Sequence, residues 1–254
     1  MDLEDFSALP VEAPFFPSLQ ALELQAVTQE EANQLLSALT RSPLSNLHLG
    51  LRGVVPNSAF ESLLSSITGG SSELRLLDVS TSDHREDSEL WSLTLLSRPF
   101  FSSLTTICIE SHGGFDITNE SLGILARNLP HIVDLRLWSA DARGKRVTLP
   151  CLAPFAEHCR SLRTLKIPLD ACDAARAFSL LATRRFPRQR ALCELMVLHA
   201  GIERPSDVAI YLNMLFGALQ KITSTADESD EGVYNGANTD SRTASDWREL
   251  RRSL

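Results

Sequence analysis

The stretch HCRSLRTLKI, residues 158–167, decides the fold. Within it Leu162, Leu165 and Ile167 follow the pattern L-x-x-L-x-L, whose last positions alternate apolar and polar residues as a half-buried β-strand does. Six further copies begin at Leu19, Leu44, Leu74, Leu104, Ile132 and Leu192. Successive copies start 25, 30, 30, 28, 30 and 30 residues apart. An interval this regular predicts a repeat protein, in which the 42 leucines among the 254 residues serve one repeating unit.

Helical segments are expected between the copies, because their apolar residues recur at helical spacing. The stretches 30–39, 58–67 and 119–129 show this spacing, and four more helices are expected at Glu89–Leu96, Leu152–His158, Ala174–Arg184 and Val208–Leu219. Thr28 with Glu31 fits a capping box, and Asn119 fits a helix entry. An eighth, weaker copy begins at Leu219 with Ile222. Each unit therefore reads as strand, loop, helix, loop.

The same alternation also describes a closed (β/α)8 barrel, which is the remote alternative and would be an enzyme scaffold. Barrel strands are covered on both faces and tend to be continuous hydrophobic runs. Here the positions between the leucines are polar: Glu23, His48, Asp78, Asp134 and Lys166. This predicts an α/β open solenoid, a horseshoe of about seven to eight repeats with parallel strands on the concave face and helices on the convex face.

The chain resembles the leucine-rich-repeat proteins, in particular the ribonuclease-inhibitor-like class. More narrowly it is similar to the solenoid of fungal, basidiomycete-type F-box/leucine-rich-repeat proteins. The residues that carry the resemblance are FPSLQALEL (16–24), FSSLTTICI (101–109), LPHIVDLRL (129–137), HCRSLRTLKI (158–167) and DVAIYLNMLFGALQKI (207–222). The resemblance covers about residues 16–224 and rests on the solenoid.

The resemblance implies a non-enzymatic protein–protein interaction module, the substrate-recognition part of an F-box subunit of a cullin-type ubiquitin ligase. The adaptor of the ligase would bind only through an F-box, and the residues before Phe16 do not form one. Leu3, Phe6 and Ala8 read as the remnant of an earlier repeat, so we expect the transcript to continue upstream. The alternative is a leucine-rich-repeat scaffold or regulator with no link to ubiquitin ligases.

Composition narrows the class of partner. The formal net charge of −8 disfavours binding to nucleic acid or to an anionic membrane surface. The N-terminal residues lack the basic and apolar regions of a signal peptide, and five scattered cysteines without a CxxC pair favour a reducing compartment. We therefore expect a cytoplasmic or nuclear protein.

No catalytic signature is present: the sequence has no GxGxxG, Walker-type loop, HExxH or GxSxG motif. His158 and Cys159 are adjacent, but a metal site needs about four ligands and no second pair lies at a supporting spacing. Cys159 is expected to be a buried hydrophobe. The sequence thus predicts no enzyme, no cofactor and no metal.

The concave face is the expected binding surface. Its N-terminal half is acidic, and its C-terminal half mixes basic residues with the apolar Met196 and Leu198. Trp138 is the sharpest candidate, since Trp and Arg are enriched at binding hot spots, although it could instead pack flat against Arg136 or Lys166. The candidate partner-binding residues are Glu23, His48, Asp78, Glu110, Asp134, Arg136, Trp138 and Lys166.

Three regions outside the concave face also carry expectations. The loops His112–Phe115 and Ala142–Arg146 form a second candidate recognition surface. The cluster of Arg184, Arg185, Arg188 and Arg190 is expected to be a solvated turn; the alternatives are a localisation signal and a contact for an acidic partner. The chain divides into a lead-in (1–15), the solenoid (16–224) and a polar linker with a short C-terminal helix (225–254). In that helix, Trp247 would either cap the last repeat or bind a partner.

Overall fold

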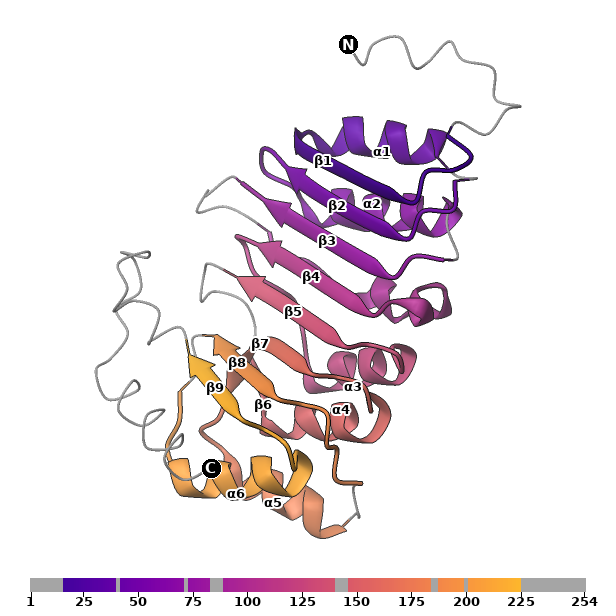
Figure 1. Cartoon of the computed structure of the whole chain (residues 1–254). Coiled ribbons are helices and arrows are strands. Elements are labelled where there is room, and N and C mark those ends of the chain that lie inside the picture. The colour runs from indigo at the N-terminus through magenta and orange to yellow at the C-terminus, as the bar shows by residue number, and fades with distance from the viewer. Residues whose placement is uncertain are drawn as a thin grey trace.

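The computed structural model describes residues 16–39, 42–70, 73–82, 89–139, 146–183, 187–198 and 201–224. Within these residues, parallel strands lie side by side in chain order in one sheet (Figure 1). The strands are β1 (Ala21–Val27), β2 (Asn46–Leu51), β3 (Leu76–Thr81), β4 (Thr106–Ser111), β5 (Asp134–Ser139), β7 (Thr164–Asp170), β8 (Glu194–Leu198) and β9 (Lys221–Ser224), while the short β6 (Val147–Thr148) pairs only with β7. Because β1 and β9 are the two outer strands and do not pair with each other, the sheet is open. The (β/α)8 barrel is thereby excluded.

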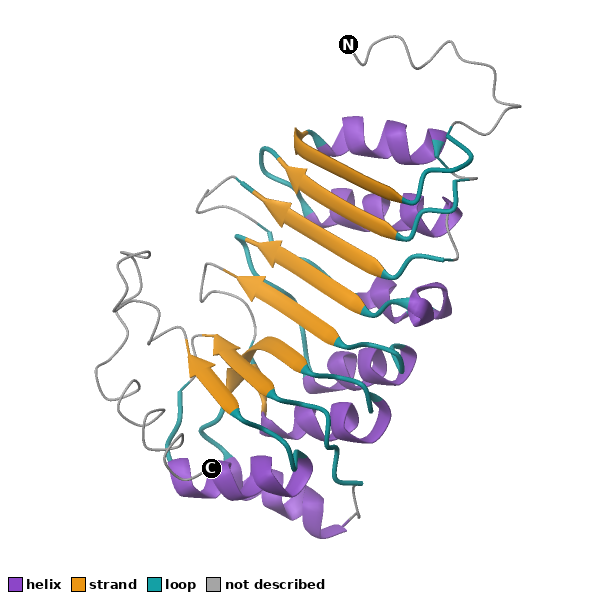
Figure 2. Cartoon of the chain, in the orientation of Figure 1, coloured by secondary structure: helices purple, strands orange, loops and turns teal. Residues whose placement is uncertain are grey.

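The helices cover one face of this sheet (Figure 2). They are α1 (Gln29–Ala38), α2 (Asn57–Gly70), α3 (Asn119–Asn128), α4 (Leu152–His158), α5 (Ala174–Thr183) and α6 (Pro205–Leu215), with 3-10 turns η2 (Thr94–Ser97), η3 (Pro99–Ser103) and η4 (Leu149–Cys151). Each strand therefore returns to the next through a crossover on the same side. This is the open α/β solenoid that the repeat predicts, and the expected strand at Leu219–Ile222 is present as β9.

Alternate residues of each strand form the core between sheet and helices. In β5, Leu135 and Leu137 are fully buried. Asp134, which precedes them, and Arg136, which lies between them, reach solvent. In β1, at the end of the described sheet, Leu22 and Leu24 are only half-buried. The first described repeat thus buries its core residues less completely than the inner repeats, which have a neighbour on both sides.

The expected helix at Glu89–Leu96 is wrong. Trp91 is instead extended: its N–H donates to the carbonyl of Gly114 at 3.0 Å, and its carbonyl accepts from the N–H of Asp116 at 3.0 Å. Only the 3-10 turns η2 and η3 follow. Pro99 begins η3, and because proline has no backbone N–H it cannot donate the hydrogen bond that would continue a helix through this position.

The helix entries differ from the expectation in detail. The capping box of Thr28 and Glu31 is confirmed, since the Thr28 side chain accepts from the Glu31 N–H and the Glu31 carboxylate from the Thr28 N–H. The cap of α3 is Thr118, one residue before the predicted entry, with Ser121 as its partner. Helix α6 begins at Pro205, before the predicted Val208, because proline suits the first turn of a helix.

Two polar side chains join successive repeats from inside the core. Cys159 is fully buried as expected, and its Sγ donates to the Ala126 carbonyl of the preceding repeat at 3.2 Å. Thirty residues later, Gln189 donates from Nε2 to the carbonyls of Cys159 and Leu162. Its Oε1 accepts from the backbone N–H groups of Ala191 and Leu192. Gln189 thus satisfies backbone groups where one repeat turns into the next.

Replacing Gln189 with alanine should destabilise the solenoid. The substitution removes the side-chain amide of Gln189 and leaves the backbone carbonyls and N–H groups that it binds without a partner. We expect the free energy of unfolding to fall by about 2–4 kcal/mol. Urea denaturation followed by circular dichroism measures the loss. The control is Gln220→Ala, because the Gln220 side chain is exposed and its removal should change the free energy by less than about 0.5 kcal/mol. Equal midpoints for the two variants would contradict the role given to Gln189.

Candidate functional site

The face of the sheet without helices, called the open face below, is the concave face of the predicted horseshoe. Its side chains form rows because the strands are parallel and in register. The central row consists of residues that face one another across neighbouring strands: Glu23, His48, Asp78, Cys108, Arg136, Lys166, Met196 and Thr223. Five of the eight candidate residues belong to this row.

The other three candidates lie beside the central row. Glu110 of β4 and Trp138 of β5 face each other in the row that follows, and Asp134 lies in the row before. The position of the central row on β4 belongs to Cys108, which the sequence did not single out. The alternation in TICIES (106–111) already placed this cysteine on the outward side of the strand. It was not chosen as a candidate because cysteine counts as an apolar residue.

Arg136 is held by a forked ion pair. Its Nε donates to Asp134 Oδ1 at 2.9 Å and its Nη2 to Asp134 Oδ2 at 2.7 Å. Two parallel bonds between planar groups fix the guanidinium in orientation. The hydrogen bond to Asp134 raises the pKa of Arg136, so its positive charge is permanent.

Trp138 packs against Lys166, which is one of the two arrangements considered from the sequence. The Lys166 Nζ lies 3.1 Å from the centroid of the Trp138 ring, a cation–π contact between β5 and β7. The half-buried ring is therefore covered on one face by the lysine, and the two side chains order each other.

The charged residues in the N-terminal half of the open face, on β1 to β4, are acidic. His48 Nδ1 lies 3.2 Å from Asp78 Oδ2, and both side chains are more than a third exposed. Glu23 accepts from the side-chain amide of Gln25 at 3.2 Å. The open-face positions of β1 to β4 hold no lysine or arginine.

Cys108 separates this acidic half from Arg136. Burial, followed by the negative charge of Asp78, raises the pKa of its thiol to about 12. The thiol is therefore neutral at physiological pH and contributes no charge to the centre of the row.

The C-terminal part of the open face is less apolar than expected. Leu198 is fully buried, so it does not project as predicted; its partner in the register, Pro168 of β7, is buried as well. Met196 is half-buried in the central row. Beside it, the Lys221 Nζ donates to Glu194 Oε1 at 2.7 Å, which compensates both charges.

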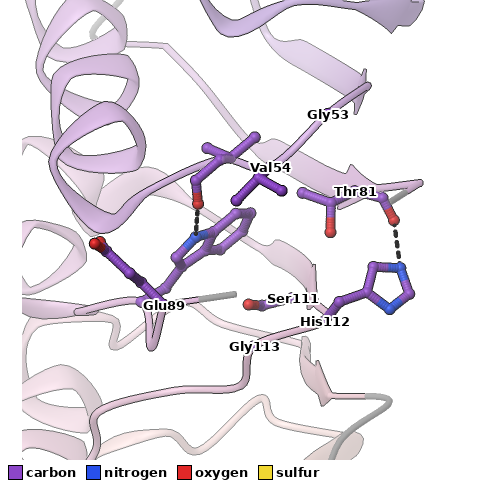
Figure 3. A pocket seen from close by; sticks show the side chains of 9 residues that line it. Gly53, Val54, Thr81, Glu89, Ser111, His112 and Gly113 are labelled. Atoms are coloured by element: carbon purple, nitrogen blue, oxygen red, sulfur yellow. Dashed lines mark hydrogen bonds between the residues drawn. The ribbon is translucent and has the colours of Figure 1, made fainter. Parts of the chain in front are cut away.

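The loop His112–Phe115, expected as a recognition surface, is packed instead. His112 and Phe115 are 8% and 1% exposed, and His112 Nε2 lies 2.7 Å from the Thr81 carbonyl (Figure 3). Nearby, Trp91 donates from Nε1 to the Val55 carbonyl at 2.9 Å and stacks on Phe60 at a centroid distance of 4.2 Å. The cavity between these loops has about 10 Å³, room for no more than one water.

Most of the second loop, residues 142–145, lies outside the described residues, as do Arg184, Arg185 and Trp247.

A larger hollow of about 400 Å³ lies where α1 and α2 begin. It is lined by Thr28, Gln29, Glu30, Arg52, Val54, Val55, Pro56, Ser58 and Ala59. Among the described residues, no three His, Cys, Asp or Glu side chains come together as a metal site would require. In the same part of the chain, none of the helices has the length and apolar character that crossing a membrane requires.

The fold and the open face define a leucine-rich-repeat solenoid. No family model matches the chain, and no curated protein matches its sequence. Among solved structures, the chain is similar to the leucine-rich repeat-containing protein LegL7 from Legionella pneumophila, with 13% identity and a TM-score of 0.33 over 99% of this chain and 85% of that one. The assignment of the fold rests on the repeat and on the sheet of this chain.

Cys108 should be slow to alkylate. With its pKa near 12 instead of 9, the thiolate population falls roughly a thousandfold, and the thiolate is the reactive form. We expect iodoacetamide at pH 8 to label Cys108 in the native protein at least a hundredfold more slowly than in urea. Mass spectrometry of the peptide that contains Cys108 measures both rates. Equal rates would show that the thiol is neither buried nor beside Asp78.

Trp138 and Lys166 should stabilise each other. A double-mutant cycle with Trp138→Leu, Lys166→Met and the double variant isolates their coupling, which we expect to be about 0.5–1 kcal/mol. Thermal and urea unfolding supply the free energies. The cycle of Trp138→Leu with Arg176→Met, an exposed arginine on α5, should show no coupling. A coupling of zero in the first cycle would mean that the contact does not form in solution.

Proposed function

We propose that the chain is a non-enzymatic protein–protein interaction module that binds its partner on the open face. The observation that carries the proposal is the cluster of Arg136, Trp138 and Lys166, which brings an aromatic ring and two cations together on the side of the sheet that no described helix covers. Trp and Arg side chains dominate the binding energy of many protein interfaces.

The cluster is ordered before a partner arrives. Asp134 fixes the Arg136 guanidinium with two hydrogen bonds, and the Trp138 ring fixes the Lys166 chain. Ordering long side chains costs free energy during binding, so a surface that has already ordered them binds more tightly. The mechanism is positioning of a partner, and no step needs a reactive group.

We further propose that the partner is a substrate of a cullin-type ubiquitin ligase, with this chain as the recognition part of an F-box/leucine-rich-repeat subunit. The support is the resemblance of segments such as FPSLQALEL (16–24) and HCRSLRTLKI (158–167) to the fungal family. The adaptor would bind through an F-box that lies outside this chain, and the subunit would act in the cytoplasm or nucleus. A scaffold or regulator unrelated to ubiquitin ligases is the competing outcome of the experiment below.

Affinity purification of the tagged full-length product tests both levels of the proposal. We expect Trp138→Ala and Arg136→Glu to deplete the same set of co-purifying proteins at least tenfold by quantitative mass spectrometry. Arg176→Glu, on the exposed side of α5, is the matched control and should deplete none. Melting curves of all variants check that they fold.

The outcomes separate the two levels. The ligase role is supported if adaptor and cullin co-purify with every variant while other proteins are lost from Trp138→Ala and Arg136→Glu. Loss of partners without any adaptor or cullin favours the scaffold. An unchanged set of partners in Trp138→Ala and Arg136→Glu would remove the open face as the binding surface.

A further inference from the structure

We propose that the C-terminal residues 247–254 fold back onto the open face and cover Pro168 and Leu198. Such a segment occupies part of the open face before any partner binds, which the proposed function does not specify. The observations behind it are side chains on β7, β8 and β9 that are buried on the side of the sheet where no described helix lies (Figure 2).

An apolar row crosses the C-terminal part of the open face. Arg136 and Lys166 pair in the register of β5 and β7. Trp138 and Pro168 each follow this pair by two residues, so their side chains lie on the same face of the sheet. Pro168 in turn pairs with Leu198 of β8. Tryptophan, proline and leucine thus succeed one another on three neighbouring strands.

Leu198 is buried although it lies outside the core. It is 0% exposed, yet it does not belong to the hydrophobic core between the sheet and the helices, to which Val197 does belong. Pro168 beside it is buried as well. The chain that follows β8 continues along β7, because the Gly201 carbonyl accepts from the Ala171 N–H at 2.9 Å. We therefore attribute the burial of this pair to a segment outside the described residues.

The last strand, β9, is covered in the same way. Among the described residues, no strand lies beyond β9, as none lies beyond β1 at the other end of the sheet. Yet Ile222 is only 2% exposed, whereas Leu22, its counterpart on β1, is half-buried. Thr223 Oγ1, on the open face, is buried and has no hydrogen-bond partner among the described residues. The end of the sheet that leads into the C-terminal residues is thus the covered one.

The C-terminal residues are within reach of this surface. Ser224 pairs with Val197, so the chain leaves β9 beside Leu198. Pro168 lies two strands away from β9, which corresponds to roughly 10 Å. A polar linker of the length of residues 225–246 spans roughly 26 Å on average. The chain is therefore long enough to turn back over β8 and β7.

The sequence WRELRRSL, residues 247–254, suits an apolar row. These residues lie outside the described part of the chain, and their sequence places Trp247, Leu250 and Leu254 at helical spacing, in one apolar stripe. A helix this short is not stable alone in water and needs an apolar surface to pack against. The buried row on β7 and β8 supplies such a surface.

The position of the segment delimits the binding surface of the open face. Seated on Pro168 and Leu198, it borders Trp138, the next side chain of the apolar row. A partner that binds at Trp138 and extends toward β9 has to displace it. The C-terminal segment therefore competes with such a partner for β7 and β8.

Photocrosslinking in the full chain tests where the segment lies. Met196, half-buried on the open face two residues before Leu198, is replaced with benzoylphenylalanine, which bonds to neighbouring C–H groups in ultraviolet light. The matched control carries the same label at Met214, which is 51% exposed on α6. We expect at least tenfold more crosslinks to residues 247–254 from position 196 than from position 214, counted by mass spectrometry of the peptides. Crosslinks from position 196 only to residues 140–145, or to a second copy of the chain, would overturn the proposal, and so would their absence.

A second measurement does not depend on the label. Trp247→Ala combined with Leu250→Ala should uncover the apolar row and raise the fluorescence of bis-ANS, a dye that binds exposed apolar surface, at least threefold. Val233→Ala combined with Tyr234→Ala, an apolar pair in the linker, is the matched control and should leave it unchanged. Equal fluorescence of the two double variants would contradict the proposal. Both measurements use the chain without a partner, so their failure leaves the proposed function standing.

Discussion

Each inner strand of this sheet buries its leucines against the repeats on either side. Leu135 and Leu137 of β5 are fully buried because β4 and β7 flank them, whereas the equivalent leucines of β1, at the end of the described sheet, are half-buried. This dependence holds the strands parallel and in register, since any slip by one residue would turn the leucines of a strand to the opposite face. The register in turn brings residues about thirty positions apart into one row.

The open face is a consequence of that register. No single repeat contains a binding site, but Asp78, Cys108 and Arg136 become neighbours because three strands align. The leucine ladder is repeated nearly unchanged, so the outward positions are free to differ from strand to strand. The chain uses this freedom to order charge: acids on the first strands, a neutral thiol in the middle, and fixed cations on β5 and β7.

The edge where the strands end is built differently. There Trp91 stacks on Phe60, and His112 lies within hydrogen-bond distance of the Thr81 carbonyl. The cavity that remains between these residues has only about 10 Å³ (Figure 3). The described part of this edge therefore supports the solenoid.

The sequence by itself determined the fold, because the spacing of the leucines and the polar residues between them require an open stack of strand–helix units. It also placed the eight candidate residues on one face, through the alternation of β-strands. Only the tertiary structure decided which of them are neighbours: that Lys166 covers Trp138, that Asp134 holds Arg136, and that Cys108 completes the row. It likewise replaced the expected helix at 89–96 with an extended Trp91 and a short 3-10 turn, and it buried Leu198. These outcomes depend on contacts between repeats, and the pattern within one repeat does not contain them.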